Sequence, residues 1–176
     1  MKLPVVRPMN SSVTEYKSSL FKKLCLDSRW IAEPIKNGSR CLVYRENGTI
    51  RLFTREWVNL SHKFKEITSR MYRIPNGTLL DSILSKKTRE LWVLDILYFG
   101  KERITEIAFK ERRNILESLV ESSRHVKLIE QYVGKEYLFS INVGIIFKNL
   151  NSTYRPSKEE SENWVRCEKI NLGRNV

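Results

Sequence analysis

The strongest structural signal in the chain is the segment RCLVYRENGTIRLFTR, residues 40–55. Two runs suited to β-strands, 40–45 and 50–55, flank the pair Asn47-Gly48. An Asn-Gly pair favours a two-residue hairpin turn, because both residues tolerate the positive φ angles that such a turn requires. Residues 40–55 are therefore predicted to form an antiparallel β-hairpin.

Further strands and helices are predicted on both sides of this hairpin. Apolar residues recur at helical spacing over 12–25 and over 105–122. The apolar run 91–98 is typical of a buried strand. The other expected elements are strands at 30–36, 78–84, 143–148 and 163–169 and a short helix at 61–71. This mixture predicts one α+β domain over residues 1–176, with mostly antiparallel sheets and flanking helices.

Charge is the most informative feature of the composition. The 176 residues include 32 Lys and Arg against 20 Asp and Glu, which gives a formal net charge of +12. Such an excess favours a polyanionic partner, either nucleic acid or an acidic protein. No apolar run approaches the roughly 20 residues of a membrane span, and no apolar N-terminal segment indicates a signal peptide. We therefore expect a cytoplasmic protein without membrane contact.

Residue types that bind metals are few and scattered. Cys25, Cys41 and Cys167 show no Cys-x-x-Cys spacing, and His62 and His125 have no acidic or thiol neighbours at ligand spacing. No disulfide, metal site or cofactor is predicted, and the thiols are expected to be buried and inert.

Eight segments, taken in chain order, resemble the motifs of one enzyme family. Residues 30–40, WIAEPIKNGSR, are similar to the motif E-P-K-x-D-G-x-R, and residues 77–84 to G-x-x-L-D-G-E-L. The family is that of the ATP-dependent DNA ligases, and the resemblance is to their adenylation (nucleotidyltransferase) domain. The other similar segments are 51–55, 92–98, 107–116, 143–148, 152–156 and 164–168.

The resemblance covers residues 8–170, approximately, and implies the nucleotidyltransferase fold that ligases share with guanylyltransferases. Only residues 170–176 follow the last motif, so no OB-fold domain is expected.

The resemblance also implies where the chemistry occurs, and this chain departs from the family there. The family's reaction needs a lysine amine that attacks the α-phosphate of ATP, but Ile35 stands at that position, beside Lys36. Ile83 and Val143 stand where the family has glutamates that bind ribose or the divalent ion. We expect these aliphatic side chains to pack together and fill the cleft, and strand alternation to point Lys36 away from it. The chain is therefore predicted to be a noncatalytic homologue and not an enzyme.

Basic residues near the family's nucleotide- and DNA-facing surface are the predicted nucleic-acid contacts, because cationic groups supply most of the nonspecific affinity for phosphates. They are Arg40, Arg55, Lys148, Arg155, Lys158 and Arg166. Alternatively, these charges are solvated or pair with Asp81 and Asp95. The leading hypothesis is a nucleic-acid-binding protein or a subunit of a DNA- or RNA-handling complex.

Three other functions stay open. The cap-binding domain of snurportin resembles the related guanylyltransferase fold and also lacks the catalytic lysine. By that analogy, Trp57 or Trp164 would bind a modified nucleotide or an RNA 5′ cap. A second alternative is a protein-protein adaptor whose basic surface meets acidic partners. The third is residual ATP-dependent ligase or nucleotidyltransferase activity through Lys36.

Overall fold

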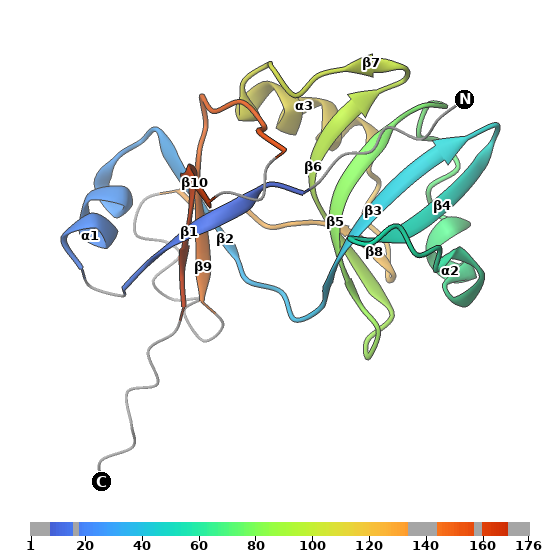
Figure 1. Ribbon diagram of the computed structural model, residues 1–176, viewed down its shortest axis with the longest axis horizontal. Helices are drawn as coiled ribbons and strands as arrows, with labels where there is room; N and C mark the ends of the chain where they lie inside the picture. Colours follow the sequence, from blue (N-terminus) through green and yellow to red (C-terminus); the bar gives the residue numbers. More distant parts are fainter. Residues whose placement is uncertain (1–7, 16–17, 134–143, 157–159, 169–176) are drawn as a thin grey trace, which may run out of the picture.

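The fold consists of two β-sheets that face each other, with helices on their outer sides (Figure 1). A computed structural model describes residues 8–15, 18–133, 144–156 and 160–168. The smaller sheet has the strand order β1-β10-β9-β2. Its strands are β1 (Asn10–Thr14), β2 (Trp30–Pro34), β9 (Ile145–Asn149) and β10 (Glu160–Cys167).

The larger sheet has the strand order β4-β3-β5-β6-β7, and β8 also pairs with β6. Its strands are β3 (Ser39–Glu46), β4 (Thr49–Thr54), β5 (Leu79–Ser85), β6 (Glu90–Phe99), β7 (Glu102–Arg103) and β8 (Val126–Leu128). The helices are α1 (Ser19–Leu26), α2 (Lys65–Thr68) after the 3-10 turn η1 (Ser61–Lys63), and α3 (Phe109–Leu119). All pairings in both sheets are antiparallel except β1 with β10 and β6 with β8, which confirms the predicted α+β class.

The predicted hairpin is confirmed as β3 and β4. Glu46 pairs with Thr49, so the loop between them has two residues. Those residues, Asn47 and Gly48, have φ angles of 48° and 77°. Two positive φ angles in succession match the type I′ turn that follows the right-handed twist of paired strands.

The predicted helix over 12–25 is wrong in its first part. Residues 10–14 form the edge strand β1, which pairs in parallel with β10 from the far end of the chain. The helix begins at Ser19 instead, where the Ser18 hydroxyl accepts a hydrogen bond from the Phe21 N–H at 3.1 Å. Periodicity alone missed this boundary because a pairing across about 150 residues overrides local preference.

Each sheet buries its outer face under helices. The helices α2 and α3 cover the larger sheet over a core that includes Val43, Leu80 and Val93. Helix α1 covers the smaller sheet, where Phe21 packs edge-on against Phe147 with ring centroids 5.6 Å apart. The inner faces of the two sheets therefore turn toward each other. Within the described residues, no helix has the length and apolarity to cross a membrane.

Candidate functional site

A cleft of ≈ 580 Å³ lies between the inner faces of the two sheets, and we call it the inter-sheet cleft. Side chains of both sheets line it, together with residues 35–38, the crossover segment that carries the chain from β2 to β3. Its size falls in the range of small-ligand sites, about 300–1,000 Å³.

The smaller sheet supplies one wall through alternation along its strands. Side chains two residues apart on a strand share a face, and β9 pairs with both β2 and β10. The residues of β2, β9 and β10 that reach the cleft include Glu33, Ile146, Lys148, Trp164 and Arg166. Residues between them, such as Phe147 and Val165, face α1 instead.

Lys148 lies at the base of the cleft and connects the two sheets. Its Nζ is 2.6 Å from Glu33 Oε2 and donates a hydrogen bond to the carbonyl of Leu94 on β6 at 3.3 Å. The ammonium also lies 4.0 Å from the centroid of the Trp164 ring. Both Lys148 and Glu33 are buried. This lysine is thus compensated by a carboxylate and an aromatic face.

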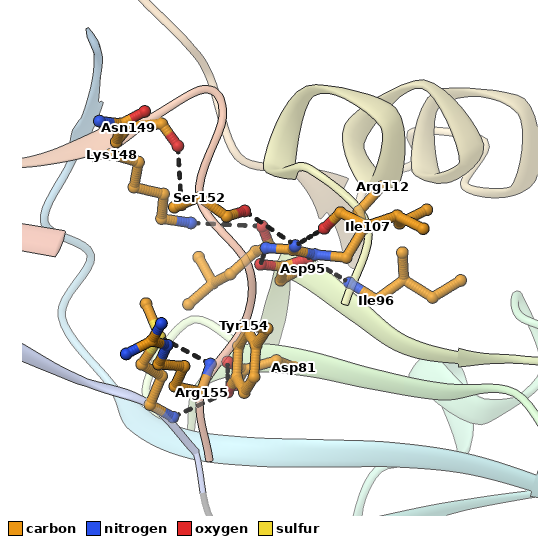
Figure 2. Close-up of polar contacts among 12 residues, drawn as sticks. Asp81, Asp95, Ile96, Ile107, Arg112, Lys148, Asn149, Ser152, Tyr154 and Arg155 are labelled. Atoms are coloured by element: carbon orange, nitrogen blue, oxygen red, sulfur yellow. Dashed lines mark hydrogen bonds and ion pairs between the residues drawn. The ribbon is translucent and has the colours of Figure 1, made fainter. Parts of the chain in front are cut away.

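The larger sheet supplies the opposite wall, where Arg40 forms a bidentate ion pair with the buried Asp81. The Tyr154 hydroxyl donates to Asp81 Oδ2 at 2.7 Å (Figure 2). It also accepts a hydrogen bond from the Met9 N–H at 2.9 Å. Burial, together with the negative charge of Asp81, raises the pKa of Tyr154 well above its usual value. Burial alone would lower the pKa of Arg40, but the charge of Asp81 outweighs it, and the net pKa is raised. Arg40 therefore stays charged and Tyr154 stays neutral at neutral pH.

A second buried pair lies behind this wall. Arg112 of α3 donates to both carboxylate oxygens of Asp95, at 2.8 and 2.9 Å, and both side chains are fully buried. The same guanidinium donates to the carbonyls of Ile107 and Ser152 (Figure 2). Because Ser152 lies between β9 and β10, this pair fastens the smaller sheet to α3 and β6.

Two more arginines line the cleft with partial exposure. Arg166 is 2.8 Å from Glu168, and Arg55 donates to the side-chain oxygen of Asn10 at 2.6 Å. Two buried N–H donors in the cleft wall, Trp164 Nε1 and Arg166 Nε, have no acceptor among the described residues. Both atoms are exceptions to the rule that buried donors are almost always paired.

The crossover segment places both Ile35 and Lys36 on the cleft. Strand β2 ends at Pro34, so the strand alternation that predicted an outward Lys36 does not apply beyond it. Lys36 Nζ is 2.8 Å from Glu130 Oε2 and 5.5 Å from the centroid of the Trp92 ring. Burial opposes the effect, but the Lys36 hydrogen bond holds the pKa of Glu130 below its ordinary value.

Gly38 fixes the path of the crossover segment beside β5. A Cβ at this position would lie 2.6 Å from the carbonyl oxygen of Leu84 and 2.7 Å from a methyl carbon of Ile83. Only glycine allows this approach.

The expected filling of the cleft by aliphatic side chains is wrong. Ile83 packs sideways against Trp92, Leu94 and Ile129, so it forms part of the wall and leaves the space open. Ile35 lines the same hollow from the crossover segment.

The structure gathers four of the predicted contact residues in the inter-sheet cleft: Arg40, Arg55, Lys148 and Arg166. Arg155 is exposed and does not line it, while Lys158 and Val143 lie outside the described residues. Trp164, a candidate for base stacking, is 1% exposed and its ring is covered by Lys148. Sequence reasoning missed the unpaired indole N–H, although a tryptophan on a strand rich in charged residues was a signal.

Three carboxylates in or behind the cleft wall already have cationic partners. Glu33 and Asp81 are committed to Lys148 and Arg40, and Glu168 to Arg166. Among the residues with described positions, no three His, Cys, Asp or Glu side chains come together as a metal site.

Comparisons with known proteins agree with the architecture. A family model described as ATP dependent DNA ligase domain matches residues 71–167. A DNA ligase of Methanococcus aeolicus is 21% identical over 198 residues, covering 89% of this chain and 35% of that protein. The SPbeta prophage-derived DNA ligase-like protein LigB of Bacillus subtilis is 27% identical over 169 residues, covering 80% of this chain and 61% of that protein. The structure of mycobacterial DNA ligase D complexed with ATP and MES has a TM-score of 0.73 at 20% identity, covering 96% of this chain and 62% of that one, so the fold is shared.

These relatives overturn one prediction. The chain was predicted not to be an enzyme, yet relatives that cover nearly nine tenths of it are named DNA ligases. The prediction relied on aliphatic residues at catalytic positions and on an outward Lys36. The open cleft and the placement of Lys36 remove the second of these arguments.

Proposed function

Because the chain belongs to the family of ATP-dependent DNA ligase domains, we propose that its inter-sheet cleft binds nucleic acid and the nucleotide of a ligase-type reaction through their phosphates. The chain spans about a third of the length of two DNA ligases that it matches, 35% of one and 34% of the other. For this reason, the ligase reaction itself is also proposed for this chain.

The observation that carries the proposal is the composition of the cleft wall. Five basic side chains line the cleft against three acidic ones: Lys36, Arg40, Arg55, Lys148 and Arg166 against Glu33, Glu160 and Glu168. Four of these cations pair with carboxylates, two of them buried, whereas Arg55 has a neutral amide partner. Phosphate oxygens are suitable acceptors for the exposed guanidinium groups in this wall.

Binding of a fluorescently labelled nicked duplex, measured by anisotropy across a salt series, tests this. The double variant Arg55→Ala/Arg166→Ala removes the two most exposed cations of the cleft. If both contact duplex phosphates, the slope of log K against log salt falls in magnitude by about 1.8. The control Lys65→Ala/Lys110→Ala removes the same charge from exposed positions that do not line the cleft.

The proposal requires that the control binds like the wild type while the cleft variant binds more weakly with the smaller slope. Equal losses in both variants would mean that net charge, and not the cleft, attracts the nucleic acid.

A second candidate function, adenylyl transfer through Lys36, is favoured by the position of that side chain on the cleft. In this step the amine attacks the α-phosphorus of ATP, a P–N bond forms, and the bond to the bridging oxygen breaks to release pyrophosphate. Glu130, 2.8 Å from Nζ, positions the side chain, and the proton that Nζ must lose before the attack goes to water.

Incubation with ATP labelled at the α-phosphate, followed by denaturing electrophoresis, tests the second candidate. The wild type is expected to retain label and Lys36→Met to lose it. Ile35→Lys, alone and combined with Lys36→Met, is a matched control, because it puts an amine at the position where the family carries it. Label on Ile35→Lys but not on the wild type would rule out Lys36 as the nucleophile.

A further inference from the structure

A second hollow, of ≈ 620 Å³, lies against the crossover segment. The crossover segment forms one side of it, and the β5–β6 turn at residues 86–89, which we call the lysine turn, forms the other; the two lie next to each other in Figure 1. Residues 35–38 line both this hollow and the inter-sheet cleft. A third hollow of ≈ 310 Å³ shares Arg40 and Arg55 with the cleft and Lys86 with the second hollow. The three hollows thus adjoin one another around the crossover segment.

The lysine turn carries uncompensated positive charge. Lys86 and Lys87 are exposed, and neither forms an ion pair within the described part of the chain. Glu90 is the acidic residue among those lining this hollow, and its carboxylate is 2.5 Å from Lys127 Nζ. No carboxylate of the described lining therefore remains to neutralise the two lysines.

The rest of the lining suits a sugar-phosphate backbone better than a base. Trp92 is 8% exposed and the ammonium of Lys36 lies over its ring, so its face is not free for stacking. Asn37, Ser39 and Thr88 add polar side chains to the walls. A basic and polar surface without an accessible aromatic face binds phosphates without reading sequence.

We propose that the lysine turn and the second hollow bind the phosphodiester backbone of a nucleic acid where it leaves the inter-sheet cleft. This rests on the proposed function, since the same nucleic acid occupies the cleft. The contact adds affinity only for a substrate with a flank long enough to pass the crossover segment, and it does not depend on base sequence.

The experiment compares wild type, Lys86→Ala/Lys87→Ala and the control Lys65→Ala/Lys110→Ala by anisotropy across a salt series. The turn itself should persist in the variant, because the Thr88 N–H bonds the Ser85 hydroxyl oxygen at 3.2 Å. The probes are a short nicked duplex, the same nick with a long duplex flank, and the same nick with a single-stranded flank.

The lysine-turn variant is expected to bind the short duplex like the wild type and the flanked probes more weakly. Its salt slope should be smaller in magnitude by about 1.8 where the flank is duplex, or by about 1.4 where it is single-stranded. The flanked probe whose affinity falls identifies whether the lysine turn binds duplex or single-stranded backbone.

Behaviour identical to the control on every probe would overturn the inference. Failure of the proposed function gives a different result. In that case the wild type binds no probe, or Arg55→Ala/Arg166→Ala has no effect while the lysine-turn variant is still impaired.

Discussion

Replacing Asp95 by Asn should be among the most destabilising single substitutions in this fold. The change removes one charge from a pair in which both side chains are fully buried and joined by two hydrogen bonds of 2.8 and 2.9 Å. It leaves the Arg112 guanidinium buried without a counter-charge, which costs about 3–5 kcal/mol. A domain of this size has about 5–15 kcal/mol of stability in total. At about 2–4 °C per kcal/mol, the melting temperature should fall by about 6–20 °C.

Urea unfolding followed by circular dichroism measures this cost. Glu117→Gln is the matched control, because it breaks the exposed Arg113–Glu117 pair on the same helix and should cost no more than about 0.5 kcal/mol. The double replacement Asp95→Leu/Arg112→Met removes both charges and should be less harmful than Asp95→Asn. A loss below about 1 kcal/mol for Asp95→Asn would refute the reasoning that this pair is a desolvated unit.

Three smaller predictions concern backbone, thiols and pH. Gly38→Ala should lower the free energy of unfolding by about 1–3 kcal/mol in urea titrations, because its Cβ would meet the Leu84 carbonyl oxygen at 2.6 Å; an unchanged midpoint would contradict the close approach. In native protein at pH 8, iodoacetamide should label Cys25 first, since burial raises the pKa of Cys41 to about 12 and of Cys167 to about 11; equal labelling of all three by mass spectrometry would refute this. The Lys127 hydrogen bond lowers the pKa of Glu90 below 4.5, so the Glu90–Lys127 pair stabilises the fold above pH 4.5 and ceases to do so as the pH falls through the folded-state pKa of Glu90. Glu90→Gln should therefore reduce the loss of unfolding free energy at acid pH, and an unchanged acid loss would argue against the pair.

The fold was predictable from sequence where the signals are local. The β3–β4 hairpin follows from Asn47-Gly48, because two positive φ angles in succession favour those residue types. Strand β1 was not predictable, because residues 10–14 become a strand only by pairing with β10. Local propensity carries no information about a partner that distant.

The site was predictable in its residues but not in their pairing. The motif resemblance placed Arg40 and Lys148 near the cleft, and the alternative of a pair with Asp81 is what the structure has for Arg40. No sequence pattern indicated that Glu33 would neutralise Lys148, since the two lie on different strands. Lys36 was judged by the rule for a continuous strand, and that rule fails because β2 ends two residues earlier, at Pro34.

Tryptophan indole signals in the ¹H–¹⁵N NMR spectrum offer the most direct check on where phosphates bind. The Trp164 indole N–H, assigned by its loss in Trp164→Phe, has no acceptor among the described residues. During titration with an oligonucleotide its resonance should move saturably, because phosphates then bind against the cleft wall that Trp164 helps to form. If the oligonucleotide binds while the Trp164 resonance stays in place, the inter-sheet cleft is not the phosphate site.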